Sequence, residues 1–316
     1  MKKKKLLLIL LVPFIISAAQ EEGFLESLEK YHTIISKWIL DKTDLVDRYL
    51  VDKNDTKREN KTLIDLSFEL GKFTQESGFY HNLAFSLQLD LPRLENKFKL
   101  KFQKVPQNSG TLLNEKDKEN LLAKDDEKKK YNLSLNYSPL AKENFFFSIS
   151  GGAQFDELMI NPYVNLVTGY KFKKSKKEDI FLKNSLRFYL GGEVKDLLIG
   201  QYFYQYQKDM VLGWIGSFVY SNKSSYQDMT SEFFALKELN KHSFYRIGFA
   251  ATAHLKNFKH AHKGDFELYA RYHNKLLNKK WLYYEITPSL NWKRKEHYKT
   301  SVGIKVKIGA TFGALK

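Results

Sequence analysis

The chain contains eight histidines, and an imidazole two positions before a serine on a strand can activate the serine hydroxyl as a nucleophile. No histidine of the sequence has a serine at that spacing. His242 and Ser243 are adjacent, so on a strand their side chains would point to opposite faces. The segment Gln75–Ser77 has no base before its serine, and Asp125–Asp126 belongs to a charged run typical of a solvated loop. We therefore expect no catalytic residue and no enzyme activity.

A metal site is the second chemistry that the histidines could support. His260 and His262 would share one side of an extended segment, and Asp265 could add an oxygen ligand. The neighbouring lysines at positions 256, 259 and 263 would repel a cation. We expect neither a metal nor another cofactor.

Rows of like charge offer a different chemistry, the attraction of oppositely charged solutes. Lys97, Lys99 and Lys101 alternate with aromatic and aliphatic residues, so on a strand their ammonium groups would share one face. Such a row needs a sheet to position it, and the sequence predicts one.

From residue 62 onward the apolar residues recur with a period of two, which is typical of strands with one apolar and one polar face. Residues 64–70 and 83–91 form the first two such runs, and Pro92 ends the second. Further strands are expected to begin near Lys97, Tyr131, Asn144, Ile160, Ile180, Leu197, Val211, Thr230, Phe244, Phe266, Trp281 and Ser301. The count is about fourteen, or twelve if the ambiguous segments near Leu197 and Thr230 are left out.

The last strand indicates the architecture most clearly. Every second residue from Val302 to Phe312 is apolar, and the residues between are small or charged. Lipid offers no hydrogen-bond partner to an open sheet edge, so strands that cross a bilayer must close into a barrel. We predict an all-β fold, a transmembrane antiparallel up-and-down barrel of about 12–14 strands. The alternative is a soluble secreted β-protein, which would need a second sheet to cover rows such as Leu282–Leu290.

An even strand count assigns the connections, because both termini then lie in the periplasm. The predicted external loops are Thr74–Gly78, Pro106–Lys130 and Lys256–Gly264. The predicted periplasmic turns are Pro92–Asn96, Gln207–Asp209 and Glu238–Lys241. Short periplasmic turns and longer external loops are typical of such barrels.

The N-terminus has the pattern of an export signal. Lys2–Lys5 is followed by the apolar run Leu6–Ala19, and small residues predict cleavage after Ala19. An uncleaved membrane anchor is the alternative, although the run is shorter than the roughly 20 residues that span a bilayer. The expected organisation is a signal peptide at 1–19, a periplasmic amphipathic helix with a linker at 20–61, and an outer-membrane barrel at 62–316.

Residues 23–51 carry apolar side chains at helical spacing, with Glu, Lys and Asp between them. We predict one amphipathic helix, or two short ones broken near Asp41–Asp44, with a polar linker at 52–61. The helix could pack on the barrel rim in the periplasm, bind a periplasmic partner, or fold into the lumen as a plug.

The amino-acid composition further restricts the class of protein. The chain has no cysteine, so disulfides cannot stabilise it. Removal of Lys2–Lys5 lowers the formal net charge from +16 to about +12. An exported protein of this charge is expected to meet no nucleic acid, and a cationic lumen or contact with anionic lipopolysaccharide are the expected consequences of the charge.

The closing segment resembles the C-terminal signal by which outer-membrane barrels are recognised for assembly. The matching residues are Ser301, Gly303, Val306, Ile308 and Phe312, and the tail 313–316 departs from the pattern, in which the aromatic is usually terminal. The helix, first hairpin and Leu89–Leu94 are similar to outer-membrane barrel proteins of Gram-negative bacteria, over about a third of the chain. This resemblance implies outer-membrane lipids and the barrel assembly machinery as partners, and it implies no activity. Phospholipase A and lipid A deacylase barrels, by contrast, present a His-x-Ser pair that this chain lacks.

Strand alternation predicts which charges face the lumen. These are Asp65, Glu69, Lys97, Lys99, Lys101, Lys183, Arg187, Arg246, Glu267, Arg271, Glu285, Lys305 and Lys307. Barrel closure would bring Asp65 and Glu69 near Lys305 and Lys307, and hairpin register would pair Arg271 with Glu285. Such pairs could simply satisfy one another in a packed interior. Alternatively, the charges line an aqueous pore and set its ion preference.

The lysine row at 97–101 lacks an acidic partner on the following strand, which favours a passive pore for small polar or anionic solutes. The alternatives are a non-conducting structural or surface barrel whose helix docks an envelope partner, and, third, a lipid-modifying enzyme. The expected location is the outer membrane of a Gram-negative bacterium.

Overall fold

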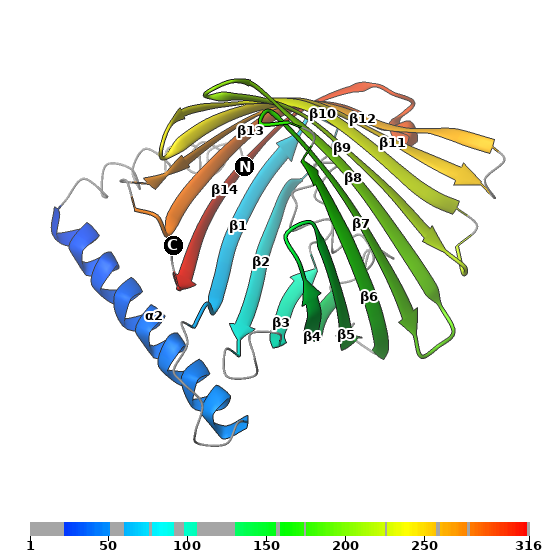
Figure 1. The fold of residues 1–316 in the computed structure, drawn as a ribbon. Coiled ribbons are helices and arrows are strands. Elements are labelled where there is room, and N and C mark those ends of the chain that lie inside the picture. Colours follow the sequence, from blue (N-terminus) through cyan, green and yellow to red (C-terminus); the bar gives the residue numbers. More distant parts are fainter. Residues whose placement is uncertain are drawn as a thin grey trace.

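The structure, a computed structural model, describes residues 22–50, 60–75, 78–91, 98–105, 130–155, 159–173, 175–224, 226–256, 260–276 and 279–314. It contains one long helix followed by fourteen strands (Figure 1). The helix is α2 (Glu22–Leu50), and a short 3-10 helix, η3 (Arg294–Glu296), precedes the last strand. No helix among the described residues is long and apolar enough to span a membrane.

The strands form a single antiparallel sheet that closes on itself, because β1 pairs with β14 as well as with β2. The strands are β1 (Leu63–Phe73), β2 (Phe79–Asp90), β3 (Phe98–Val105), β4 (Lys130–Ala141), β5 (Phe145–Phe155), β6 (Ile160–Lys173), β7 (Glu178–Tyr189), β8 (Val194–Gln207), β9 (Met210–Ser221), β10 (Tyr226–Asn240), β11 (Ser243–Lys256), β12 (His260–Lys275), β13 (Leu282–Trp292) and β14 (Thr300–Gly313). The prediction of an all-β closed barrel of 12–14 strands is confirmed, with the ambiguous segments near Leu197 and Thr230 both forming strands.

The alternation of the sequence becomes an outer and an inner surface. On β14, Val302 and Ile304 are exposed on the outside while Ser301 and Lys305 are buried on the inside. Phe233 and Ile247, each 58% exposed, continue the apolar exterior around the barrel. A closed sheet with this exterior and a polar interior has the residue distribution of a membrane barrel.

The strand ends define two rims. The α2 end is the rim where β1 begins and β14 ends, and the far end is the opposite rim, which includes the connection between β13 and β14. Residues 74–78 join strands at the far end and the turn after Gln207 lies at the α2 end, as the alternation predicts. The predicted loop Lys256–Gly264 is largely wrong, because β11 reaches Lys256 and β12 begins at His260, directly opposite it. Pro92–Asn96 and residues 106–129 lie outside the described residues.

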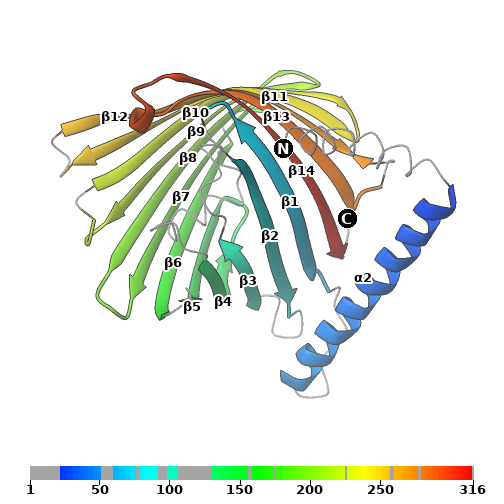
Figure 2. The ribbon, with the colours of Figure 1, turned by 180° about the vertical axis from the view of Figure 1, so that it is seen from behind.

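Helix α2 is continuous from Glu22 to Leu50, so the alternative of two short helices is not what forms. It lies beside the barrel at the ends of β14 and β1 rather than between the strands (Figures 1 and 2). His32 donates a hydrogen bond to the carbonyl oxygen of Thr311 at 2.9 Å and stacks on Phe312, while Ser36 accepts one from the backbone N–H of Gly313 at 3.1 Å. The described helix therefore packs on the rim and does not fill the lumen.

The interior surface contains a repeated device in which an aromatic ring covers a glycine directly opposite on the neighbouring strand. The pairs are Phe73–Gly303, Phe146–Gly169, Tyr163–Gly152, Phe234–Gly213, Tyr269–Gly248 and Tyr283–Gly309. Only glycine leaves room for the ring, since a Cβ atom at Gly248 would lie 2.6 Å from Cζ of Tyr269. These pairs fix the register and hold each ring flat against the wall.

A glycine-to-alanine pair tests this device. We expect Gly248→Ala to lower the free energy of unfolding by about 1–3 kcal/mol, because the added methyl group displaces Tyr269. Gly151→Ala is the matched control, since nothing lies within 4 Å of the methyl group that it adds. Urea unfolding in lipid vesicles, monitored by tryptophan fluorescence, measures the stability of both variants. Equal stability of the two variants would contradict the packing argument.

Candidate functional site in the barrel lumen

The inward side chains divide the lumen into two surfaces of different charge. We call the inner face of β10–β14 and β1 the paired wall, and the inner face of β3–β8 the cationic wall. Carboxylates and cations alternate on the paired wall. Amides, hydroxyls and cations dominate the cavity that lies beside the cationic wall.

The paired wall is anchored by a buried cluster around Glu232. Its carboxylate accepts hydrogen bonds from the guanidinium of Arg246 and the hydroxyl of Tyr269. Nε of Arg246 also donates to the Tyr269 hydroxyl at 2.8 Å, and the guanidinium lies 3.7 Å from the ring centre of Phe234. The Glu232 side chain is 1% exposed, so its charge depends on these partners.

Further along the paired wall the charges neutralise one another across strands. Nζ of Lys305 lies 3.7 Å from a carboxylate oxygen of Glu267, across the intervening strand β13. Glu285 contacts Nδ1 of His273 at 3.2 Å and Nζ of Lys307 at 4.0 Å. The charges on this part of the lumen therefore offset one another, although neither carboxylate oxygen of Glu267 has a hydrogen-bond donor among the described residues.

The register corrects one predicted pair and agrees with another. Glu285 lies directly opposite His273, so the predicted register pairing of Arg271 with Glu285 is wrong. Glu69 lies opposite Lys307, as barrel closure predicts, whereas Asp65 lies opposite Thr311 and accepts a hydrogen bond from its hydroxyl at 2.7 Å. The cross-strand partner depends on the length of the turn after β12, which alternation alone does not give.

A cavity of about 200 Å³ lies against the cationic wall. Its charged lining residues are Lys101, Lys183 and Arg187. Its polar lining residues are Gln103, Asn132, Ser134, Asn136, Ser148, Ser150, Tyr163, Asn165 and Ser185. No carboxylate is among the described residues that line it. Such a lining favours a solute that is negatively charged and rich in hydrogen-bonding groups.

Arg187 is the most constrained cation of this cavity. It is 4% exposed, and its guanidinium lies 4.2 Å from the ring centre of Tyr163, with an N–H directed to the hydroxyl of Tyr189 at 3.3 Å. Tyr163 in turn donates to Asn132 at 2.7 Å, and Tyr189 donates to Gln154 at 3.1 Å. Nε of Arg187 has no hydrogen-bond acceptor within the described part of the chain.

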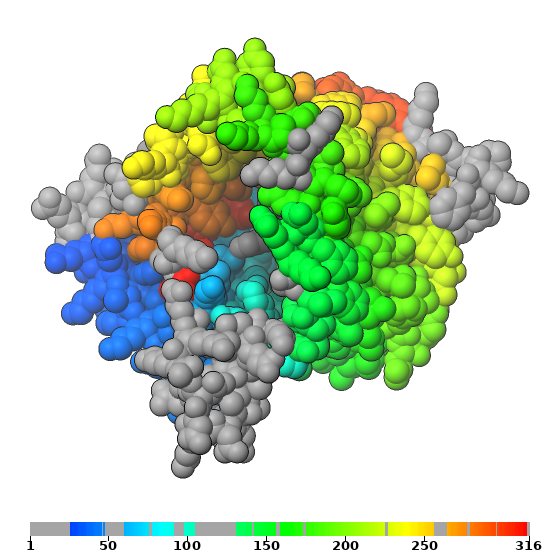
Figure 3. All heavy atoms as spheres, viewed as in Figure 1, coloured from blue at the N-terminus to red at the C-terminus, as the bar shows by residue number. Residues whose placement is uncertain are grey.

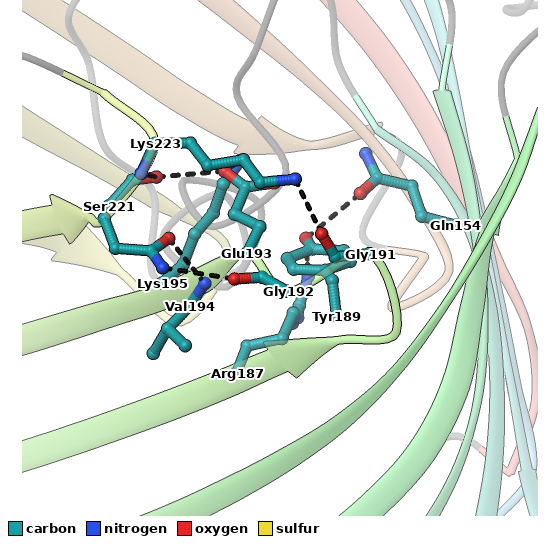
Figure 4. Close-up of polar contacts among 11 residues, drawn as sticks. Gln154, Arg187, Tyr189, Gly191, Gly192, Glu193, Val194, Lys195, Ser221 and Lys223 are labelled. Carbon is teal, nitrogen blue, oxygen red and sulfur yellow. Dashed lines mark hydrogen bonds and ion pairs between the residues drawn. The ribbon is translucent and has the colours of Figure 1, made fainter.

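The same wall is tied together at the far end by the turn between β7 and β8 (Figure 4). The carboxylate of Glu193 lies 3.4 Å from Nζ of Lys195 and accepts a hydrogen bond from Ser221 at 2.9 Å. Lys223 donates to the carbonyl of Gly191 at 2.7 Å. These contacts join the β7–β8 turn to β8 and to the end of β9, at the end of the wall where β7 carries Arg187.

A second cavity, of about 600 Å³, lies beside the paired wall. Its charged lining residues include Asp65, Lys101, Arg246, Arg271, Glu285 and Lys307. Lys101 and Gln103 line both cavities, so they lie at the boundary between the two. A solute that moves from one cavity to the other would therefore pass the ammonium group of Lys101.

The structure brings most of the predicted lumen residues together. Lys97 lies outside the described residues, and Lys99 is exposed near the α2 end, opposite Asp90. The lysine row therefore has a carboxylate on the preceding strand, although the following strand presents amides and hydroxyls as predicted. The segment predicted as an assembly signal forms β14, with Ser301 and Gly303 inside and Val306, Ile308 and Phe312 outside.

Several lumen residues were missed from the sequence. Lys195 precedes Leu197, where the sequence places the start of β8 three residues late, so alternation does not reach it. Glu232 lies in the segment predicted from Thr230, whose assignment as a strand the sequence leaves ambiguous. Tyr163 and Tyr269 are not among the predicted lumen residues, yet each covers a glycine inside the lumen. Among the residues whose side chains are described, no three His, Cys, Asp or Glu groups gather as metal ligands. The side chains of His260 and His262 lie outside that described set.

No family model and no curated protein matches the sequence. Among solved structures, the chain is similar to a loop-deletion mutant of OmpT, an outer membrane protein of Vibrio cholerae, with 7% identity over 80% of this chain and 99% of that one, and a TM-score of 0.47. It is similar to the CymD monoaromatic hydrocarbon channel, with 8% identity, 82% and 90% coverage, and a TM-score of 0.47. The KdgM porin shares 10% identity over 78% of this chain and 99% of that one, with a TM-score of 0.37. These neighbours are bacterial outer-membrane barrels.

Proposed function

We propose that this protein is an outer-membrane β-barrel that allows small polar or anionic solutes to pass through its lumen. The observation that carries the proposal is the cavity at the cationic wall, which combines Lys101, Lys183 and Arg187 with amides and hydroxyls. The closed sheet with an apolar exterior supports a location within a bilayer. In this proposal the termini lie in the periplasm, residues 1–19 direct export, and the C-terminal strand binds the assembly machinery.

The charge asymmetry supports a preference for anions. Glu232, Glu267 and Glu285 on the paired wall each contact a cation, so their negative charge is largely neutralised. No carboxylate is among the described residues that line the cavity at the cationic wall, whereas Lys101, Lys183 and Arg187 are. A passing anion would therefore meet a net positive potential on one side of the lumen.

The second candidate is a non-conducting structural barrel. The observation that favours it is the depth of burial on the paired wall, where Glu267 is 0% exposed and Glu232 is 1% exposed. Such burial is typical of a filled interior rather than a water path. The two candidates differ in whether ions cross the barrel.

Single-channel recording in a planar bilayer, with a salt gradient across it, tests the proposal. We expect stable conductance steps and a reversal potential on the anion-selective side, because the described charged residues that line the cavity at the cationic wall are all cations. A folded but silent barrel would contradict the pore and favour the structural alternative. A cation-selective channel would contradict the role given to the cationic wall.

A further inference from the structure

Helix α2 turns an unexpected side toward the barrel. Its buried residues are His32, Ser36, Ile39, Thr43 and Asp47, which recur at helical spacing and are mostly polar. Hydrogen bonds to the backbone at the end of β14 account for this orientation, because His32 binds the carbonyl of Thr311 and Ser36 binds the N–H of Gly313. Most of the apolar residues of the helix therefore remain exposed and do not pack against the barrel.

These apolar residues share one exposed flank, on which Lys42 lies between Trp38 and Leu45. Tyr31 is 64% exposed, Ile34 53%, Trp38 60% and Leu45 62%. They recur at steps of three, four and seven residues, so they share a side of the helix along its length. Figure 3 shows α2 on the molecular surface beside the barrel.

The other flank is polar and meets the connections of the rim. Glu29 pairs with Lys279 in the turn between β12 and β13. Asp44 accepts a hydrogen bond at 2.9 Å from Asn60, which precedes β1. The helix therefore has three sides: one against the end of β14, one toward the rim connections, and an apolar one directed away from them.

We propose that the apolar flank of α2 lies in the headgroup–acyl boundary of the bilayer that surrounds the barrel, at the α2 end. This inference rests on the proposed membrane location. The helix meets the barrel through Phe312, the last outward residue of β14, so its apolar flank continues the apolar exterior of the sheet. Trp38 and Tyr31 are the residue types that favour this boundary, because each combines an apolar ring with a polar group. An interfacial helix is expected to bury its apolar side by about 5–10 Å.

The absence of cysteine from the sequence makes a site-specific test possible. Trp38→Cys, Ile34→Cys and Lys37→Cys would each carry a nitroxide label, in full-length protein reconstituted into vesicles of phosphatidylethanolamine and phosphatidylglycerol. Lys37 is exposed away from the apolar flank and is the matched control on the helix. Ile247→Cys, on the exterior of β11, is the control for insertion of the barrel. The readout is label accessibility to oxygen, which concentrates in lipid, compared with a water-soluble nickel chelate.

We expect an oxygen-to-nickel accessibility ratio at Trp38→Cys and Ile34→Cys that is at least about threefold higher than at Lys37→Cys. Equal, water-like ratios on both flanks would overturn the proposal if Ile247→Cys still reports lipid. Labels at positions 34 and 38 that neither reagent reaches would also overturn it, since a protein partner would then cover this flank. A water-like ratio at Ile247→Cys would instead contradict the membrane location itself, and so the proposed function.

Discussion

Replacing Arg246 with alanine is expected to lower the free energy of unfolding by about 3–5 kcal/mol, the largest single-residue effect in the barrel wall. The substitution removes both the ion pair and one hydrogen-bonded neighbour from a cluster in which Glu232 is 1% exposed. The carboxylate of Glu232 would remain buried with Tyr269 as its described donor. Urea unfolding in lipid vesicles measures the loss.

The matched control is an ion pair at the surface. Lys171 lies 3.6 Å from Asp179, and the two side chains are 50% and 45% exposed. Lys171→Ala is expected to change stability by at most about 1 kcal/mol, because water screens this pair. If Arg246→Ala costs no more than Lys171→Ala, the cluster does not stabilise the wall. The double variant Arg246→Met with Glu232→Leu is expected to recover most of the lost stability, since no charge then remains buried in this cluster.

The second large effect is on ion selectivity. Lys101→Glu is expected to lower the anion-to-cation permeability ratio by about fivefold or more, because Lys101 lies at the boundary of both cavities. A reversal changes the local charge by two units, which at about 8 Å in water amounts to about 1 kcal/mol for a passing ion. Reversal potentials in a salt gradient measure the ratio.

The control for this prediction is a lysine on the outer surface. Lys237 lies on β10 between inward-facing positions and is exposed outside the barrel, so Lys237→Glu is expected to leave selectivity unchanged. The double variant Lys99→Glu with Lys101→Glu is expected to reverse the preference further. Unchanged selectivity in that double variant would show that the lysine row does not act on passing ions.

The sequence predicts the barrel well because alternation is a direct consequence of strand geometry. Val302 to Phe312 alternates without a break, and the structure turns that pattern into an outer and an inner face. Alternation does not define which residues lie opposite one another, because that depends on the turn. The sequence therefore places Glu285 in the lumen but not beside His273.

The helix shows a second limit of sequence patterns. An amphipathic pattern identifies α2, yet the usual expectation is that its apolar side packs on the protein. Here the end of β14 presents backbone groups, which His32 and Ser36 satisfy, and the apolar side is turned outward. No property of residues 23–51 alone reveals this choice, because the partner groups belong to the opposite end of the chain.

The seam between β1 and β14 joins eleven residue pairs, from Leu63 with Gly313 to Phe73 with Gly303. Every other neighbouring pair of strands is consecutive in the chain and can form from a local hairpin. The seam alone must await the final residues, so an incomplete polypeptide that stops before β14 keeps two unsatisfied edges rather than forming a smaller ring. The barrel therefore closes only when β14 has been made. Truncated chains keep open sheet edges, which expose them to aggregation and to proteases.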